Sequence, residues 1–146
     1  MRTLLACAAV ASLFVAAGGC LGDGGTVTLT FDQQMSVTPT VVGFNASNAT
    51  GTAETDGFVH FTATSAMGTL TMLTISPIHA GDMVDLMQEH NFVSFDISGA
   101  GWGSNGGMLA VDEVSPYKVR FLAVPMIRGS GSAMGSFVIN GSGTFK

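Results

Sequence analysis

The side chains that most often do chemistry in proteins are few here and widely spaced. The three histidines are His60, His79 and His90, and none belongs to an HxH or HExxH pair, so their spacing predicts no metal site. We expect His60 to lie on a sheet face and the other two to lie in solvated turns. A catalytic histidine needs a positioned partner, and the sequence indicates none.

One set of soft donors has a regular spacing. His79, Met83, Met87 and His90 would share one face of a helix, and thioether ligands suit Cu(I). Methionine is also a common filler of apolar cores. A hairpin would scatter these four side chains, and we expect a hairpin here. The prediction is therefore no metal and no cofactor.

Six acids could gather at loops. They are Asp82, Asp85, Glu89, Asp96, Asp112 and Glu113. Carboxylate pairs serve glycoside hydrolysis and carboxylate clusters bind calcium, but no DxDxDG loop is present. We interpret the acids as solvated turn residues, with an acid-pair hydrolase as an alternative. No serine stands in a GxSxG elbow, so we predict no catalytic residues.

Trp102 is the one aromatic residue that we single out as a candidate ligand-binding residue. It is the only tryptophan, and glycines surround it from Gly99 to Gly107. A large aromatic ring on a glycine-rich loop can anchor a partner or stack on a sugar. The same ring can instead fold back and cap the end of the core, which is the interpretation that we prefer.

The N-terminal stretch predicts the location of the protein. Arg2 precedes an apolar run from Leu4 to Ala17, which small residues and Cys20 then close. This order is typical of a secretory signal. A cysteine directly after small residues resembles the lipobox of bacterial lipoproteins. The resemblance implies removal of residues 1–19, acylation of the Cys20 thiol and a membrane partner bound through that lipid.

The residues that follow Cys20 refine this prediction. Residues 20–25 form a short tether before a domain that we place at 26–146. Leu21 is not an acid, which resembles lipoproteins exported to the outer membrane of the cell envelope. An ordinary secretory signal, cut without lipidation, would instead give a secreted or periplasmic protein. A transmembrane anchor is disfavoured because the apolar run is shorter than about 20 residues.

Charge and cysteine content exclude several function classes. Removal of residues 1–19 leaves four basic and ten acidic side chains, a net charge of −6. This negative charge gives no electrostatic attraction to the phosphates of nucleic acid. The only cysteines are Cys7 and Cys20, so the mature domain would have neither a disulfide nor a thiolate metal site.

The domain shows the two-residue periodicity of strands. We expect strands at Thr26–Phe31, Thr40–Asn45, Phe58–Thr64, Thr69–Ser76, Met83–Met87, Phe92–Ser98, Met108–Val111 and Tyr117–Ile127. Between them we expect a turn or weak edge at 45–57, an irregular segment at 99–107 and a turn at 112–116.

The last two segments carry more detailed predictions. On the strand Tyr117–Ile127 we place Val119, Phe121, Ala123 and Ile127 on one face. The end of the chain, Ser136–Phe145, predicts a hairpin that turns at Asn140-Gly141. A single bulged strand is the alternative.

The pattern predicts an all-β fold, a single antiparallel sandwich or small barrel of about 8–10 short strands. The domain loosely resembles small Gly/Thr-rich β-sheet lipoproteins of Gram-negative bacteria whose function is unknown, in Gly68–Thr71, the Trp102 turn and Gly143–Phe145. We expect a non-catalytic, lipid-anchored structural or binding module. A lipocalin-like carrier of a small apolar ligand is the alternative, because phenylalanine and methionine exceed what one thin core needs.

Overall fold

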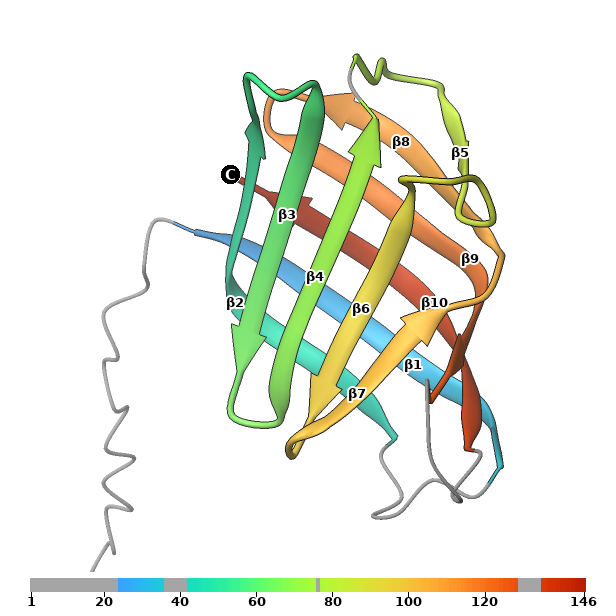
Figure 1. Ribbon diagram of the computed structural model, residues 1–146. Helices are drawn as coiled ribbons and strands as arrows, with labels where there is room; N and C mark the ends of the chain where they lie inside the picture. Colours follow the sequence, from blue (N-terminus) through green and yellow to red (C-terminus); the bar gives the residue numbers. More distant parts are fainter. Residues whose placement is uncertain (1–23, 36–41, 76, 129–134) are drawn as a thin grey trace, which may run out of the picture.

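The structure, a computed structural model, describes residues 24–35, 42–75, 77–128 and 135–146. The expected signal at 1–19 and Cys20 lie outside the described residues. The described chain is all β (Figure 1). Its strands are β1 (Gly25–Met35), β2 (Gly43–Ala53), β3 (Phe58–Ser65), β4 (Gly68–Ile75), β5 (Met83–Asp85), β6 (Phe92–Ile97), β7 (Ala100–Ser104), β8 (Met108–Val114), β9 (Tyr117–Ile127) and β10 (Ser136–Phe145).

The sheet closes on itself, which decides between the sandwich and the barrel. The order β10-β1-β2-β3-β4-β6-β7-β9 is antiparallel throughout, and β9 pairs again with β10. The expected all-β fold is therefore confirmed as a small closed barrel with β8 and β5 as additional strands. Closure satisfies the backbone groups that an open sheet would leave at its edges.

Two strands, β7 and β8, share the edge of β9 that lies opposite β10. β7 pairs with β9 only through Gly103 and Ser104, and β8 takes the place beside the first half of β9. The side chain of Asn91 connects the β5 segment to the end of β4. Asn91 accepts a hydrogen bond from the Ile75 amide at 2.9 Å and donates one to the Asp85 carbonyl at 3.5 Å. These bonds fasten the β5 segment to β4.

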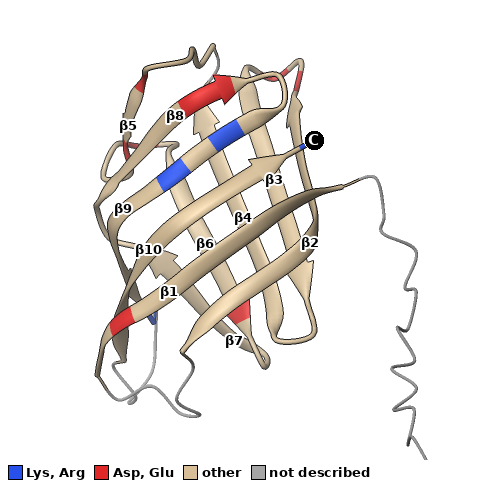
Figure 2. Ribbon diagram, turned by 180° about the vertical axis from the view of Figure 1, so that it is seen from behind, with Lys and Arg blue, Asp and Glu red and all other residues tan. Residues whose placement is uncertain are grey.

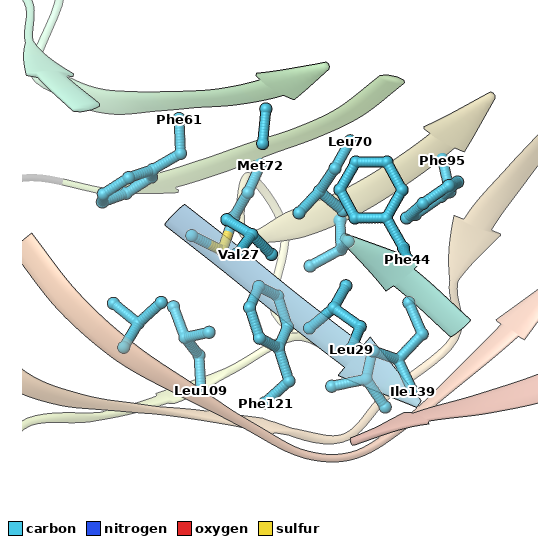
Figure 3. Packing of buried hydrophobic residues seen from close by; sticks show 14 of the residues in the cluster. Val27, Leu29, Phe44, Phe61, Leu70, Met72, Phe95, Leu109, Phe121 and Ile139 are labelled. Carbon is cyan, nitrogen blue, oxygen red and sulfur yellow. The ribbon is translucent and has the colours of Figure 1, made fainter. Parts of the chain in front are cut away.

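Inward side chains of the barrel strands fill the interior. On β6, Val93, Phe95 and Ile97 are buried, as their alternation predicts. Figure 3 shows side chains from opposite walls pointing toward one another across the barrel. The largest fully buried side chains are Phe44, Phe61, Phe95, Phe121, Phe137, Phe145, Leu29, Leu70, Met72, Leu109, Met126 and Ile139. An eight-stranded barrel is just wide enough for side chains to fill it, and here they do.

Glycines on inward positions make room for the phenylalanine rings. A Cβ atom on Gly51 would lie 2.9 Å from the rings of Phe61 and Tyr117. A Cβ atom on Gly143 would lie 2.5 Å from the Phe145 ring. The Phe61 ring packs edge-on against Phe145, with centroids 5.0 Å apart. Large and small residues thus alternate around one layer of the core.

The segment 45–57 is not the turn or weak edge that its polarity predicts. Most of it forms β2, which pairs with β1 on one side and β3 on the other. Its inward residues are Ala46, Ala49 and Gly51, which are too small to give a hydrophobic period. A register shift against β1 further breaks the two-residue rhythm between Ala46 and Ala49. The prediction failed because the part of β2 after Asn45 fills its inward positions with small residues only.

Local irregularities also correct the predictions for the last two strands. Ala123 is exposed and has a φ of 48°, so Val124 and Met126 turn inward instead of Ala123 and Ile127. The terminal hairpin is wrong as well. Ser136–Phe145 is the single bulged strand β10, which pairs with β1 and β9 along its length.

Four further strands differ from the predictions. The irregular segment 99–107 contains the strand β7, and the expected turn at 112–116 begins with the last residues of β8. β1 continues to Met35, and a register shift follows Asp32. The expected strand at 83–87 is confirmed in kind but ends at Asp85. Within the described residues no helix is long and apolar enough to cross a membrane.

The packed interior gives a stability prediction. Phe121→Ala removes a ring that is 1% exposed, so we expect the free energy of unfolding to fall by about 3–5 kcal/mol. Urea denaturation measures this value. Phe92→Ala is the matched control, because Phe92 is 42% exposed on the outer wall. Equal effects of the two substitutions would contradict the packed interior.

Candidate functional site

The candidate site is a groove of about 310 Å³ on the outer wall, over β1, β8, β9 and β10. Its charged side chains lie on β8 and β9, where Figure 2 shows an acidic segment beside two basic ones. Hydroxyl side chains of β1 and β10 complete its lining. They are Thr26, Thr28, Ser142 and Thr144.

Cross-strand register places these groups in two rows. Thr28 lies opposite Ser142, which lies opposite Arg120. In the next row Thr26 lies opposite Thr144, which lies opposite Lys118. Directly opposed residues project from the same face of a sheet. The rows therefore bring together hydroxyl and basic groups from strands at the two ends of the domain.

A β-bulge positions two acids at the groove, Asp112 in its lining and Glu113 beside it on Lys118. Val111 pairs with Val119 and Glu113 pairs with Lys118, so Asp112 is an extra residue on β8. An unbroken strand would point Asp112 and Glu113 to opposite faces. The bulge lets both acids reach basic partners on the outer wall.

Two ion pairs follow from this arrangement. Arg120 donates from Nε and Nη2 to the Asp112 carboxylate at 2.8–3.1 Å, a bidentate geometry that fixes both groups. Lys118 Nζ donates to Glu113 Oε1 at 2.8 Å. The hydrogen bond from Arg120 lowers the pKa of Asp112, and the same contact raises the pKa of Arg120.

Trp102, the residue singled out from the sequence, lies in the core. It is 4% exposed, and its ring packs against Phe137 with centroids 5.0 Å apart. It pairs in register with Phe95, whose side chain points inward. In this position the indole offers no surface to a ligand outside the barrel.

The histidines lie apart, each near one acid. His60 lies on the outer face of β3 with Nε2 3.5 Å from Asp56, as its strand position predicts. His79 and His90 lie in the turns around β5 and are largely exposed. The described residues contain no group of three or more His, Cys, Asp or Glu side chains placed to hold a metal ion.

Several of the acids singled out from the sequence serve turns. Asp82 accepts a hydrogen bond from the His79 amide at 2.6 Å. Asp85 and Asp96 accept from amides two and three residues further along the chain, at 2.9 and 3.0 Å. Asp112 and Glu113 form the ion pairs of the groove. Side chains of this type commonly stabilise tight turns through such bonds.

The sequence alone did not identify the groove. Lys118 and Arg120 lie on the face of β9 opposite Val119 and Phe121, and Asp112 and Glu113 were interpreted as solvated turn residues. The missing information was the pairing of β1 with β10, whose residues lie more than a hundred positions apart. The alternating threonines of β1 were the one available signal.

Comparison with known proteins does not narrow the function. No protein-family model, no curated protein and no solved structure matches the chain. The function is therefore inferred from the geometry of the described residues.

The ion pair between Asp112 and Arg120 gives a testable prediction for the pKa of Asp112. Its contribution to stability is present above the ordinary Asp pKa of about 3.9 and is lost as the pH falls through the lowered pKa of Asp112. Arg120→Gln should raise the pKa of Asp112 toward the ordinary value, as measured by carboxyl ¹³C NMR. Lys118→Gln should change it less. An unchanged pKa in Arg120→Gln would contradict the bidentate pair.

Proposed function

We propose that the protein is a non-catalytic binding module of the bacterial cell envelope that acts through the outer wall of its barrel. In this proposal a lipid on Cys20 anchors it to a membrane, and Leu21 favours the outer membrane. The alternative location is secreted or periplasmic. The pattern of Leu4–Cys20 supports the anchor, and the short tether would hold the barrel close to the membrane surface.

The observation that supports an outer binding surface is the contrast between the two sides of the wall. Inside the barrel, twelve large side chains are less than 2% exposed. Outside, the groove combines hydroxyl groups with fixed charges. Ligand sites are concave and place a few polar groups precisely, and the groove has these properties.

A lipocalin-like carrier is the alternative function. An interior ligand would have to displace part of the phenylalanine cluster. One observation favours it, because the buried Thr74 hydroxyl has no hydrogen-bond partner among the described residues. A buried hydroxyl ordinarily binds protein or water. An acid-pair hydrolase has less support, since the acids described above stabilise turns or ion pairs.

The mass of the protein tests the anchor. We expect the membrane-fraction protein to have the mass of a chain cleaved before Cys20 plus acyl groups. Cys20→Ser removes the thiol that would carry the lipid, so this variant should lose the acyl mass. An unmodified, soluble wild-type protein would overturn the anchor and favour secretion.

Trp102 gives a test of the interior alternative. Because it is the only tryptophan and lies among the core side chains, an apolar ligand inside the barrel would change its fluorescence. We expect titration with a long-chain fatty acid to leave the emission unchanged. Unfolding in urea is the positive control. A saturable shift with the fatty acid would contradict the outer-wall proposal and support a carrier.

A further inference from the structure

The charges of the groove neutralise one another. Asp112 pairs with Arg120, and Glu113 pairs with Lys118. An anionic ligand would have to compete with two carboxylates, and the mature net charge of −6 would repel it. A cationic ligand would have to compete with the guanidinium and the ammonium group. A neutral ligand can bind without breaking either pair.

The ion pairs nevertheless leave hydrogen-bonding groups unused. Among the described residues, Arg120 Nη1 and Glu113 Oε2 make no hydrogen bond, and Lys118 Nζ makes one of its three. These groups are charged, so hydrogen bonds to them are stronger than those between neutral groups. The pairs also fix the groups in place before any ligand binds.

The two rows of hydroxyl side chains add groups that can both donate and accept hydrogen bonds. Thr26, Thr28 and Ser142 are exposed, and Thr144 is half-buried. None of the four makes a side-chain hydrogen bond within the described residues. A hydroxyl both donates and accepts. The groove thus presents fixed donors, fixed acceptors and groups that can be either.

We infer that this groove binds a neutral, hydroxyl-rich ligand, a saccharide, through the two ion pairs and the hydroxyl rows of β1 and β10. Each sugar hydroxyl both donates and accepts, which matches the mixed groups of the groove. The volume of about 310 Å³ lies at the lower end of ligand sites, so it fits a small saccharide or a short stretch of a longer one. This inference rests on the proposed function and names the ligand of the same site.

The groove has no aromatic ring in its lining, so stacking adds nothing to the affinity. We expect a dissociation constant on the order of millimolar. Saturation-transfer difference NMR detects binding in this range with dilute protein. The full chain, as purified from cells, is tested with maltohexaose, mannohexaose and chitohexaose as neutral probes. Oligogalacturonate and chitosan oligomers are the acidic and basic probes.

The matched variants use threonine and valine, which have the same shape and both favour strands. The double substitution Thr28→Val with Thr144→Val removes two groove hydroxyls and should weaken binding of the neutral probe about tenfold. Thr62→Val is the control, because Thr62 is an exposed outer residue of β3 away from the groove. Unchanged Trp102 emission verifies that each variant is folded.

The result expected is saturation transfer to a neutral probe, lost in the double variant and kept in the control. Binding should be equal in about 50 mM and 500 mM sodium chloride, since screening does not affect a neutral ligand. Transfer only to a charged probe, or to none, would overturn the ligand class. Binding that survives the double variant would overturn the site. The mass of the Cys20 protein does not enter this experiment, so failure here leaves the anchor of the proposed function unaffected.

Discussion

The rest of the structure depends on filling a closed barrel of fixed width. Eight strands enclose a narrow interior, and seven phenylalanine side chains of the described chain are buried in it. The strands accommodate this volume by placing glycine where a ring from a neighbouring residue lies. Gly51 faces the Phe61 ring, and Gly143 faces Phe145. The glycine content of the chain is therefore in part a consequence of core packing.

Closure also explains why the strands are irregular. Each strand must keep its apolar residues inward while it bends around the barrel, and bulges adjust the phase where the rhythm fails. On β9 the turn of the backbone at Ala123 brings Val124 and Met126 into the core. On β8 a bulge affects the outer face of the wall, because it lets Asp112 and Glu113 reach Arg120 and Lys118.

A filled interior leaves the outer wall as the surface for the proposed binding. The outer face of an antiparallel barrel is set by the residues between the core positions, and here many of these are threonine or serine. Paired charges on β8 and β9 hold a polar groove in a defined geometry (Figure 2). The proposed saccharide site needs no new element, since it uses side chains that the barrel already fixes.

The sequence by itself determined the elements whose alternation is local. Val93, Phe95 and Ile97 alternate with polar residues, and this period needs no knowledge of the partner strand. The all-β class and the antiparallel arrangement follow from such runs. The part of β2 after Asn45 was missed because its inward residues are alanine and glycine. β7 was missed because its glycines resemble a loop.

Only the tertiary structure decided what depends on distant pairing. Whether the sheet closes is set by β9 and β10 with β1, and one-dimensional periodicity contains no information on that contact. The same pairing sets Thr26 beside Thr144. The inward position of Trp102 follows from its register with Phe95. The candidate site combines side chains from both ends of the domain, so it exists only once β1 has paired with β10.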